Sequence, residues 1–99
     1  MEFIIKNLKV SVSELSRKIG YIIIDTNEMN EFNLVRRLQF DSYPRFHIYA
    51  KHAGDRLIIN LHLDQKKPSY KGTHAHSGEY EGPVVEDEAD RIKEILENL

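Results

Sequence analysis

The sequence predicts an α+β fold in which a small antiparallel sheet packs against two or three helices. The sheet is expected to contain a hairpin near residues 45–64 and one or two further strands. Residues 45–64 alternate apolar and polar side chains with the period of two that a strand requires. Residues 83–98 repeat apolar side chains at steps of three and four, as an amphipathic helix does. The chain has 99 residues, of which 40% are hydrophobic and 30% charged, so we expect residues 1–99 to form a single compact domain.

Two elements are predicted near the start of the chain. Residues 2–6 are short, apolar and partly β-branched, which indicates a strand. Ser11 and Glu14 have the spacing of a capping box, and Gly20 is a typical residue to end a helix. A helix is therefore predicted over residues 11–19.

The next stretch contains a strand pattern followed by a helix pattern. Residues 21–24 are one tyrosine and three isoleucines, and turn-forming residues follow them, so we predict a buried strand. Beyond this strand, apolar residues recur at every third position, with Arg36 and Arg37 on the opposite side. The recurring residues are Met29, Phe32, Val35 and Leu38. Their spacing predicts a second helix near residues 28–39.

Residues 45–64 are predicted to form a β-hairpin, because two alternating segments flank a short polar turn. A turn at Gly54 and Asp55, which both tolerate positive φ, places His47 opposite His62. The alternative is a turn one residue earlier, which shifts the pairing by two residues. Either turn leaves the same side chains on each face of the hairpin.

The polar face of this hairpin carries the side chains that are most informative about function. It combines two imidazoles, an amide, a phenol and a carboxylate, which are groups that bind ligands and transfer protons. An ordinary solvated face is the alternative interpretation, since antiparallel sheets often have one. We predict a site for a small-molecule or anionic ligand, or for a metal, on this face and the loop that follows it. The predicted ligand-binding residues are His47, Tyr49, Asn60, His62, Asp64, Tyr70 and Glu79.

Residues 65–82 show no periodicity and contain several residues that break regular structure, so they are predicted to form a long loop. Loops of this length in a small domain are often functional. His74 and His76 lie two residues apart within the loop, and with His62 they supply the three protein ligands that a catalytic zinc site typically uses. A divalent metal such as zinc is therefore the candidate cofactor, with His62, His74 and His76 as its predicted ligands.

The most regular pattern in the chain predicts a helix over residues 83–98. Proline at its first position and acidic residues in its first turn suit a helix N-terminus. Its apolar stripe is expected to cover the apolar face of the sheet. The stripe consists of Val85, Ala89, Ile92, Leu96 and Leu99.

Composition argues against several classes of function. The net charge of −2 gives no overall basic field for nucleic acid, although Lys66, Lys67 and Lys71 surround Tyr70 in the long loop. Cysteine is absent, which excludes disulfides and thiolate metal sites. The sequence contains no P-loop, dinucleotide-binding glycine motif or nucleophile elbow. No apolar run is long enough to span a membrane, so we expect a cytoplasmic protein without a membrane partner.

Two classes of function remain. In the first, the polar face of the hairpin binds a small ligand or metal, and if it is catalytic, a histidine acts as general base oriented by Asp64 or Glu79. In the second, the chain is a non-catalytic interaction module that recognises a protein or nucleic-acid partner through the loop at 65–82. The residues leave open whether the protein is an enzyme.

Overall fold

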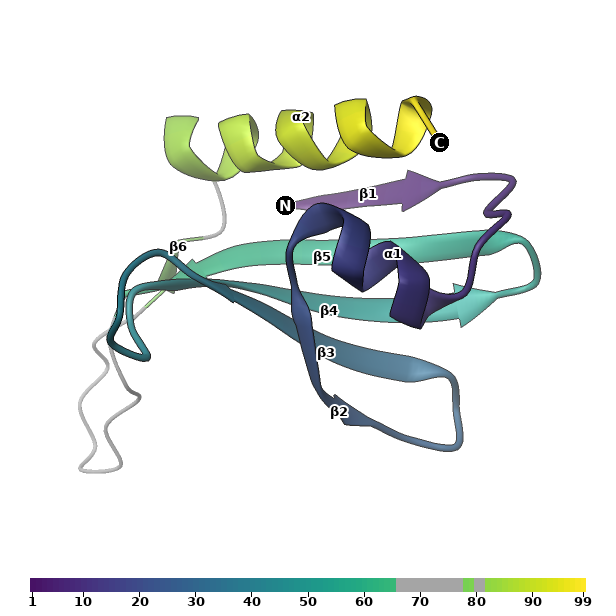
Figure 1. Cartoon of the computed structure of the whole chain (residues 1–99), viewed down its shortest axis with the longest axis horizontal. Helices are drawn as coiled ribbons and strands as arrows, with labels where there is room; N and C mark the ends of the chain where they lie inside the picture. The colour runs from purple at the N-terminus through teal and green to yellow at the C-terminus, as the bar shows by residue number, and fades with distance from the viewer. Residues whose placement is uncertain (66–77, 80–81) are drawn as a thin grey trace.

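The computed structural model describes residues 1–65, 78–79 and 82–99 (Figure 1). These residues form an antiparallel sheet and two helices, which confirms the α+β class. A third helix does not occur among them. The sheet also has more strands than the hairpin and one or two others that were predicted, because residues 31–37 and 78–79 form strands as well. The strands are β1 (Glu2–Ile5), β2 (Ile22–Thr26), β3 (Glu31–Arg37), β4 (Arg45–Ala53), β5 (Arg56–Asp64) and β6 (Gly78–Glu79), and the helices are α1 (Val12–Ile19) and α2 (Pro83–Glu97).

Five strands lie side by side in the order β1-β5-β4-β3-β2, and each is antiparallel to its neighbours (Figure 1). The short strand β6 pairs with the end of β5, where Glu79 is opposite Leu63. The prediction of an uninterrupted loop over residues 65–82 is therefore wrong at β6. Two residues can pair through their backbones without any side-chain periodicity, so the sequence pattern does not reveal such a strand. The rest of that loop, apart from residues 65 and 82, lies outside the described residues.

The hairpin of β4 and β5 confirms the prediction from the Gly54 and Asp55 turn. His47 lies opposite His62, and the apolar sides of both strands face the core. Gly54 has a φ of 63°, which glycine adopts without strain. The register cannot shift by one residue, because such a shift would turn the apolar side of one strand to the polar side of the other.

The predicted helix over residues 28–39 is wrong, because most of this segment is β3. The recurrence of apolar residues every third position is ambiguous over so few residues, and aromatic and β-branched residues such as Phe32 and Val35 favour a strand. β3 pairs with β2 on one side and with β4 on the other, which satisfies its backbone. Read as a strand, it directs Leu34, which is 1% exposed, into the core.

The turn before β3 is closed by asparagines rather than by a helix cap. Oδ1 of Asn27 accepts hydrogen bonds from the backbone N–H groups of Met29 and Glu31. Asn30 has a φ of 59°, a left-handed conformation that asparagine tolerates better than most residues. These asparagines suit either a helix cap or a turn. The turn forms because the residues that follow pair with β2 and β4 as the strand β3.

β2 is an edge strand, whereas its isoleucines predict a buried one. Ile23 packs against the core, but Ile22 is 65% exposed and Ile24 is 50% exposed. The register between β2 and β3 shifts between Ile23 and Asp25, which marks a β-bulge. A run of isoleucines is buried on both sides only where other layers cover both faces of the strand.

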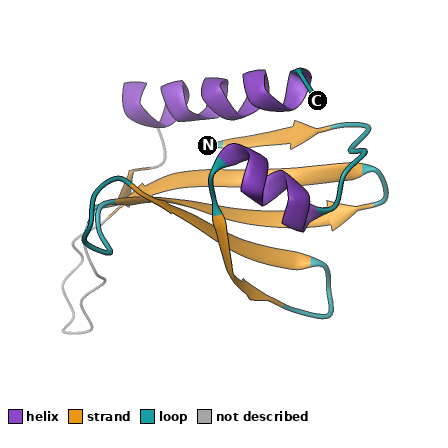
Figure 2. Cartoon of the chain, in the orientation of Figure 1, coloured by secondary structure: helices purple, strands orange, loops and turns teal. Residues whose placement is uncertain are grey.

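The two helices pack with one face of the sheet to form the core (Figure 2). α1 confirms the predicted helix and both of its predicted ends. Oγ of Ser11 accepts the backbone N–H of Glu14, and Gly20 ends the helix with a φ of 84°. The core cluster contains Leu15 of α1 and Ile59 of β5, which are almost fully buried.

α2 confirms the predicted C-terminal helix and ends one residue earlier, at Glu97. Val85, Ala89 and Ile92 are buried as predicted, but Leu99 lies beyond the helix and is 56% exposed. Neither helix in the described part of the chain is long and apolar enough to cross a membrane.

Candidate metal centre

The face of the sheet opposite the core, which we call the open face, carries several of the side chains that were predicted to bind a ligand or metal. Alternate residues of the hairpin point to it, so His47 of β4 and His62 of β5 lie next to each other. Asp64 follows His62 by two residues and therefore shares this face. β3 adds Asn33, which is opposite Tyr49 of β4.

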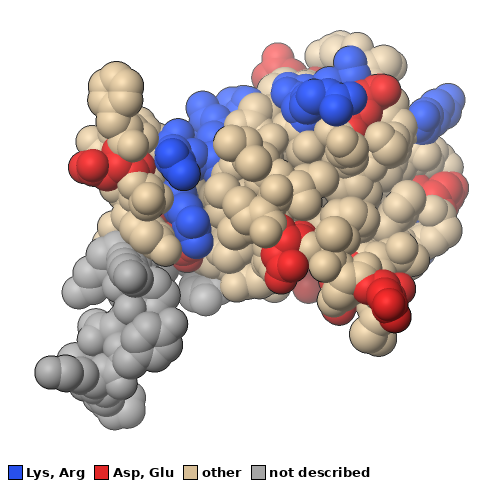
Figure 3. All heavy atoms as spheres, turned by 60° about the horizontal axis from the view of Figure 1, so that its bottom comes forward, with Lys and Arg blue, Asp and Glu red and all other residues tan. Residues whose placement is uncertain are grey.

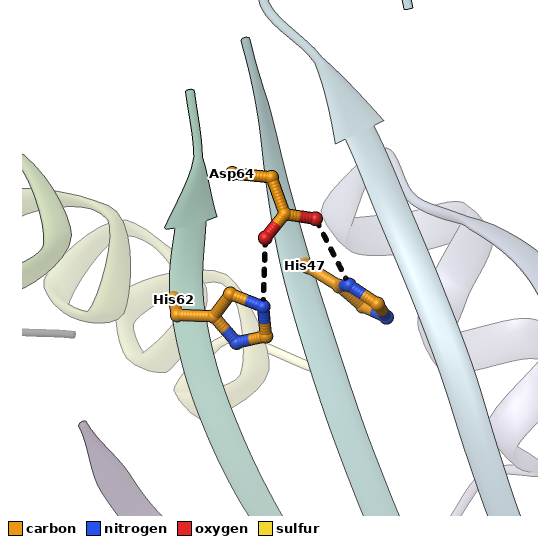
Figure 4. Close-up of side chains that lie close together, drawn as sticks. All are labelled: His47, His62 and Asp64. Carbon is orange, nitrogen blue, oxygen red and sulfur yellow. Dashed lines mark hydrogen bonds and ion pairs between the residues drawn. The ribbon is translucent and has the colours of Figure 1, made fainter. Parts of the chain in front are cut away.

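The carboxylate of Asp64 lies between the two imidazoles (Figure 4). Its Oδ1 is 2.9 Å from Nε2 of His62, and its Oδ2 is 3.1 Å from Nδ1 of His47. Nε of Arg45 donates to the same Oδ2 at 3.3 Å. The other ring nitrogen of His47, Nε2, is 3.2 Å from Oδ1 of Asn33. His47 therefore has an oxygen atom beside each of its two nitrogens.

The aromatic ring of Tyr49 stacks on both imidazoles. Its centroid is 4.3 Å from that of His47 and 5.4 Å from that of His62, and both contacts are stacked. The two imidazole centroids are 4.8 Å apart. Aromatic contacts of this kind add to the packing of the three side chains.

Burial changes the ionisation of the two histidines, which are only 7% (His47) and 4% (His62) exposed. Loss of solvation lowers the pKa of each imidazole below its usual value, and the negative charge of Asp64 offsets part of this effect. The positive charge of Arg45 acts in the same direction as burial on both rings. Both histidines are therefore biased toward the neutral form, which is the form that binds metal ions.

His47, His62 and Asp64 form a group that could hold a metal ion. Each offers one ligand atom, and these atoms all lie within 4.8 Å of one another. Imidazole nitrogen and carboxylate oxygen are common ligands of zinc and related ions. Among the described residues, this is the one group of three such side chains that meets these criteria.

The remaining residues predicted for the site have different outcomes. Asn60 lies on the open face opposite Tyr49, but it is exposed and outside the group of three. Glu79 lies in β6, opposite Leu63. The predicted site residues that fall outside the described part of the chain are Tyr70, His74 and His76. The ligand set of His62, His74 and His76 therefore stays a prediction.

Sequence reasoning missed the part that Asn33 plays, because it placed residues 28–39 in a helix. A period-two reading of residues 31–37 would have put Asn33 on the same face as Val35 and beside the hairpin. His47 was expected to bind a ligand but was not among the predicted metal ligands.

The charged side chains do not form a single-sign surface on the face drawn in Figure 3. That view shows small groups of Lys and Arg and small groups of Asp and Glu scattered among uncharged residues, with some groups of opposite charge in contact. Comparisons with protein-family models, with curated proteins and with solved structures find no match to this chain.

Proposed function

We propose that this protein binds a divalent transition-metal ion, with zinc as the best-fitting example, through Nδ1 of His47, Nε2 of His62 and one carboxylate oxygen of Asp64. The observation that carries this proposal is that His47, His62 and Asp64 each place one ligand atom within 4.8 Å of the other two. The proposal concerns binding, and metal-assisted catalysis would be a further step.

In the tautomer of His47 that carries its proton on Nε2, the contact with Asp64 favours a cation. A neutral imidazole has one N–H, so it can donate to only one of the two oxygens. If Nε2–H donates to Oδ1 of Asn33, a lone pair on Nδ1 faces the carboxylate of Asp64 across 3.1 Å. A second proton on the ring would relieve this contact, but burial lowers the pKa of His47 and disfavours that proton. A metal ion supplies the positive charge without protonating the ring.

The surroundings of His47 match those of a metal-bound histidine. Such histidines usually donate their other ring N–H to an oxygen atom, which selects the tautomer and orients the ring. Asn33 supplies that oxygen, and Tyr49 stacks on the same ring. Zinc bonds of about 2.0 to 2.2 Å hold tetrahedral ligand atoms about 3.3 to 3.6 Å apart, so ligand atoms that are up to 4.8 Å apart would have to approach by about 1 Å when they bind one ion.

Arg45 opposes metal binding, because its guanidinium contacts the same carboxylate oxygen as His47. A bound divalent ion would repel this charge, and the Arg45 side chain, which is 20% exposed, would have to move toward solvent. Three protein ligands leave one tetrahedral position open, which a water or a small anionic ligand can occupy.

We expect purified, untagged protein to bind one zinc ion per chain in a titration against a chromophoric chelator. His47→Gln and His62→Gln should each weaken this binding by about tenfold or more, because each removes one ligand. Arg45→Gln should tighten it, because it removes a neighbouring positive charge. His52→Gln is the matched control, since His52 lies on β4 but outside the group.

Two results would contradict the proposal. One is zinc binding in the His47 and His62 variants that equals binding in wild type. The other is loss of zinc binding in the double variant of His74→Gln and His76→Gln, together with normal binding in His47→Gln. That result would assign the metal to His62, His74 and His76, the ligand set predicted from the sequence. Heteronuclear NMR of the imidazole nitrogens gives an independent readout, because coordination shifts the resonance of the bound nitrogen.

A further inference from the structure

A row of charged side chains crosses the open face of the sheet beside the metal centre. Arg37 of β3 is directly opposite Arg45 of β4, which is in turn directly opposite Asp64 of β5. Residues that are opposite each other in an antiparallel pair point to the same face, with Cβ atoms about 4.5 to 5.5 Å apart. We call these three residues the arginine row. His47 follows Arg45 by two residues on the same strand, so the arginine row lies next to the candidate metal ligands.

Arg45 has more hydrogen-bond donors than acceptors among the described residues. Its side chain is only 20% exposed, and a guanidinium carries five N–H groups. In the described part of the chain, the hydrogen bond that this guanidinium makes is from Nε to Asp64. The ring of Tyr43 covers one face of the guanidinium, with its centroid 4.6 Å from Cζ of Arg45. A planar group that is stacked in this way presents its terminal N–H groups at its edge, where they can donate to a bound anion.

Arg37 adds a second positive charge to the open face. It is exposed, and none of the ion pairs among the described residues includes it. Like charges directly opposite each other destabilise a sheet. Asp64 supplies one negative charge for two arginines, so the arginine row has an excess of positive charge before any metal binds. A divalent ion held by Asp64 and the two histidines increases this excess.

We propose that the metal centre and the arginine row together bind the phosphate group of a phosphate monoester or the equivalent phosphonate. One oxygen occupies the open position of the metal, and the others accept hydrogen bonds from Arg45 and Arg37. This inference rests on the proposed function, because the metal supplies one of the contacts. The anion lies between two positive groups that otherwise repel each other, so Arg45 does not have to move toward solvent when the anion is present.

The number and charge of these groups favour a phosphate over a carboxylate. A phosphate monoester has three terminal oxygens and a charge of about −1.5 to −2 at pH 7. The fork of one guanidinium matches two of these oxygens, which leaves the third for the metal. A carboxylate that binds the metal through one oxygen has a single oxygen left for Arg45. Its single negative charge also compensates less of the positive charge at the site.

The test measures how phenylphosphonate, which has no ester bond to hydrolyse, changes the affinity of the untagged full chain for zinc in the chelator titration. A protein-free titration corrects for the zinc that the anion itself binds. Saturating phenylphosphonate should tighten zinc binding by about fivefold or more, and zinc should tighten phenylphosphonate binding by the same factor. Benzoate has the same ring and a carboxylate in place of the phosphonate, so it should tighten zinc binding by less than about twofold.

Substitution of each arginine tests its part in the site. Arg45→Gln should bind zinc more tightly than wild type in the absence of the anion, but should gain less than about twofold from phenylphosphonate. Arg37→Gln should change zinc affinity by less than about twofold and should gain less from phenylphosphonate than wild type does. Arg56→Gln is the matched control, because Arg56 is an exposed arginine at the other end of β5, and it should gain as much as wild type.

The phosphate group can belong to a small molecule or to a phosphorylated side chain of a protein. A short peptide that carries phosphonomethylphenylalanine between two glycines distinguishes these sources. Tightening of zinc binding equal to that by phenylphosphonate supports a small-molecule phosphate. Peptide binding that is at least about tenfold tighter supports a phosphorylated side chain.

Several results overturn the inference and leave the metal centre standing. One is zinc binding in wild type that phenylphosphonate does not tighten, and another is equal tightening by benzoate. Equal gains from phenylphosphonate in wild type and Arg45→Gln overturn it as well, and so does phenylphosphonate binding that is the same with and without zinc. Failure of wild type to bind zinc has a different meaning, because it overturns the proposed function and this inference with it.

Discussion

At the scale of single residues, the protonation of His47 and His62 controls what the candidate metal centre can bind. A proton and a metal ion compete for the same nitrogen lone pairs, so metal affinity falls as the imidazoles become charged. Burial shifts this competition toward the metal, because it disfavours the charged ring. The same ionisation also affects the stability of the metal-free protein.

In the presence of a chelator, the free energy of unfolding should fall as the pH decreases below about 6.5, the usual pKa of histidine. The pKa values of His47 and His62 are lowered in the folded state, so in this range the unfolded chain binds more protons. Their contribution to stability is therefore present above about pH 6.5 and is lost as the pH falls through the folded-state pKa.

Urea denaturation between about pH 5 and 8 measures this loss. The stability of His62→Gln should change less with pH than that of wild type, because one of the two buried imidazoles is absent. Parallel curves for wild type and His62→Gln would show that this imidazole does not link pH to stability.

At the scale of elements, docking of α2 depends on a few side chains that are removed from solvent completely. Ile92 and Val85 are both 0% exposed and belong to the core cluster with the sheet. Val84, next to Val85, is 48% exposed, so the two faces of the helix differ sharply. Docking, rather than intrinsic helix propensity, accounts for most of the stability of such a helix.

Ile92→Ala should lower the free energy of unfolding by about 2 to 5 kcal/mol, through lost burial and the cavity that remains. Val84→Ala is the matched control on the exposed side of the helix and should change stability by less than about 0.5 kcal/mol. Chemical denaturation of both variants measures the difference. Equal small effects would mean that α2 is not docked on the sheet in solution.

At the scale of the whole molecule, charged side chains gather around the buried Glu88 of α2. This cluster joins α2 to α1, to β3 and to Tyr21, the residue that precedes β2. The carboxylate of Glu88 accepts hydrogen bonds from Tyr21 at 2.6 Å and from Arg91 at 2.7 and 3.0 Å. Arg36 of β3 lies 3.4 Å from both carboxylate oxygens. Arg91 also donates to the carbonyl of Ile19, at the end of α1. Burial, followed by the bond to Glu88, raises the pKa of Tyr21, so its hydroxyl remains a donor.

Glu88→Ala should lower the free energy of unfolding by about 2 to 4 kcal/mol, because it leaves hydrogen-bond donors without an acceptor. The loss is limited because the side chains of Arg36 and Arg91 are each one-third exposed to solvent. Glu86→Ala, on an exposed position of the same helix, should have little effect. A double-mutant cycle with Tyr21→Phe measures the coupling between α2 and the start of β2. Additive effects would contradict a shared network.

Local chemistry and side-chain periodicity made several elements predictable from the sequence alone. The caps of α1 depend on Ser11 and Gly20, and the hairpin register depends on the turn at Gly54 and on alternation in β4 and β5. The same alternation predicted that His47, His62 and Asp64 share a face. These features involve residues that are close in sequence or paired across one tight turn, so no distant contact is needed to specify them.

Only the tertiary structure decided the nature of β3, the exposure of β2 and the contacts around Asp64. Apolar residues spaced by three fit a short helix or a strand, and β3 became a strand because β2 and β4 satisfy its backbone on both sides. That pairing also brought Asn33 to His47, a contact between residues 14 positions apart in the chain. The sequence by itself determined which side chains could form a site, whereas the order of the strands decided which of them meet, because contacts across a sheet depend on which strands become neighbours.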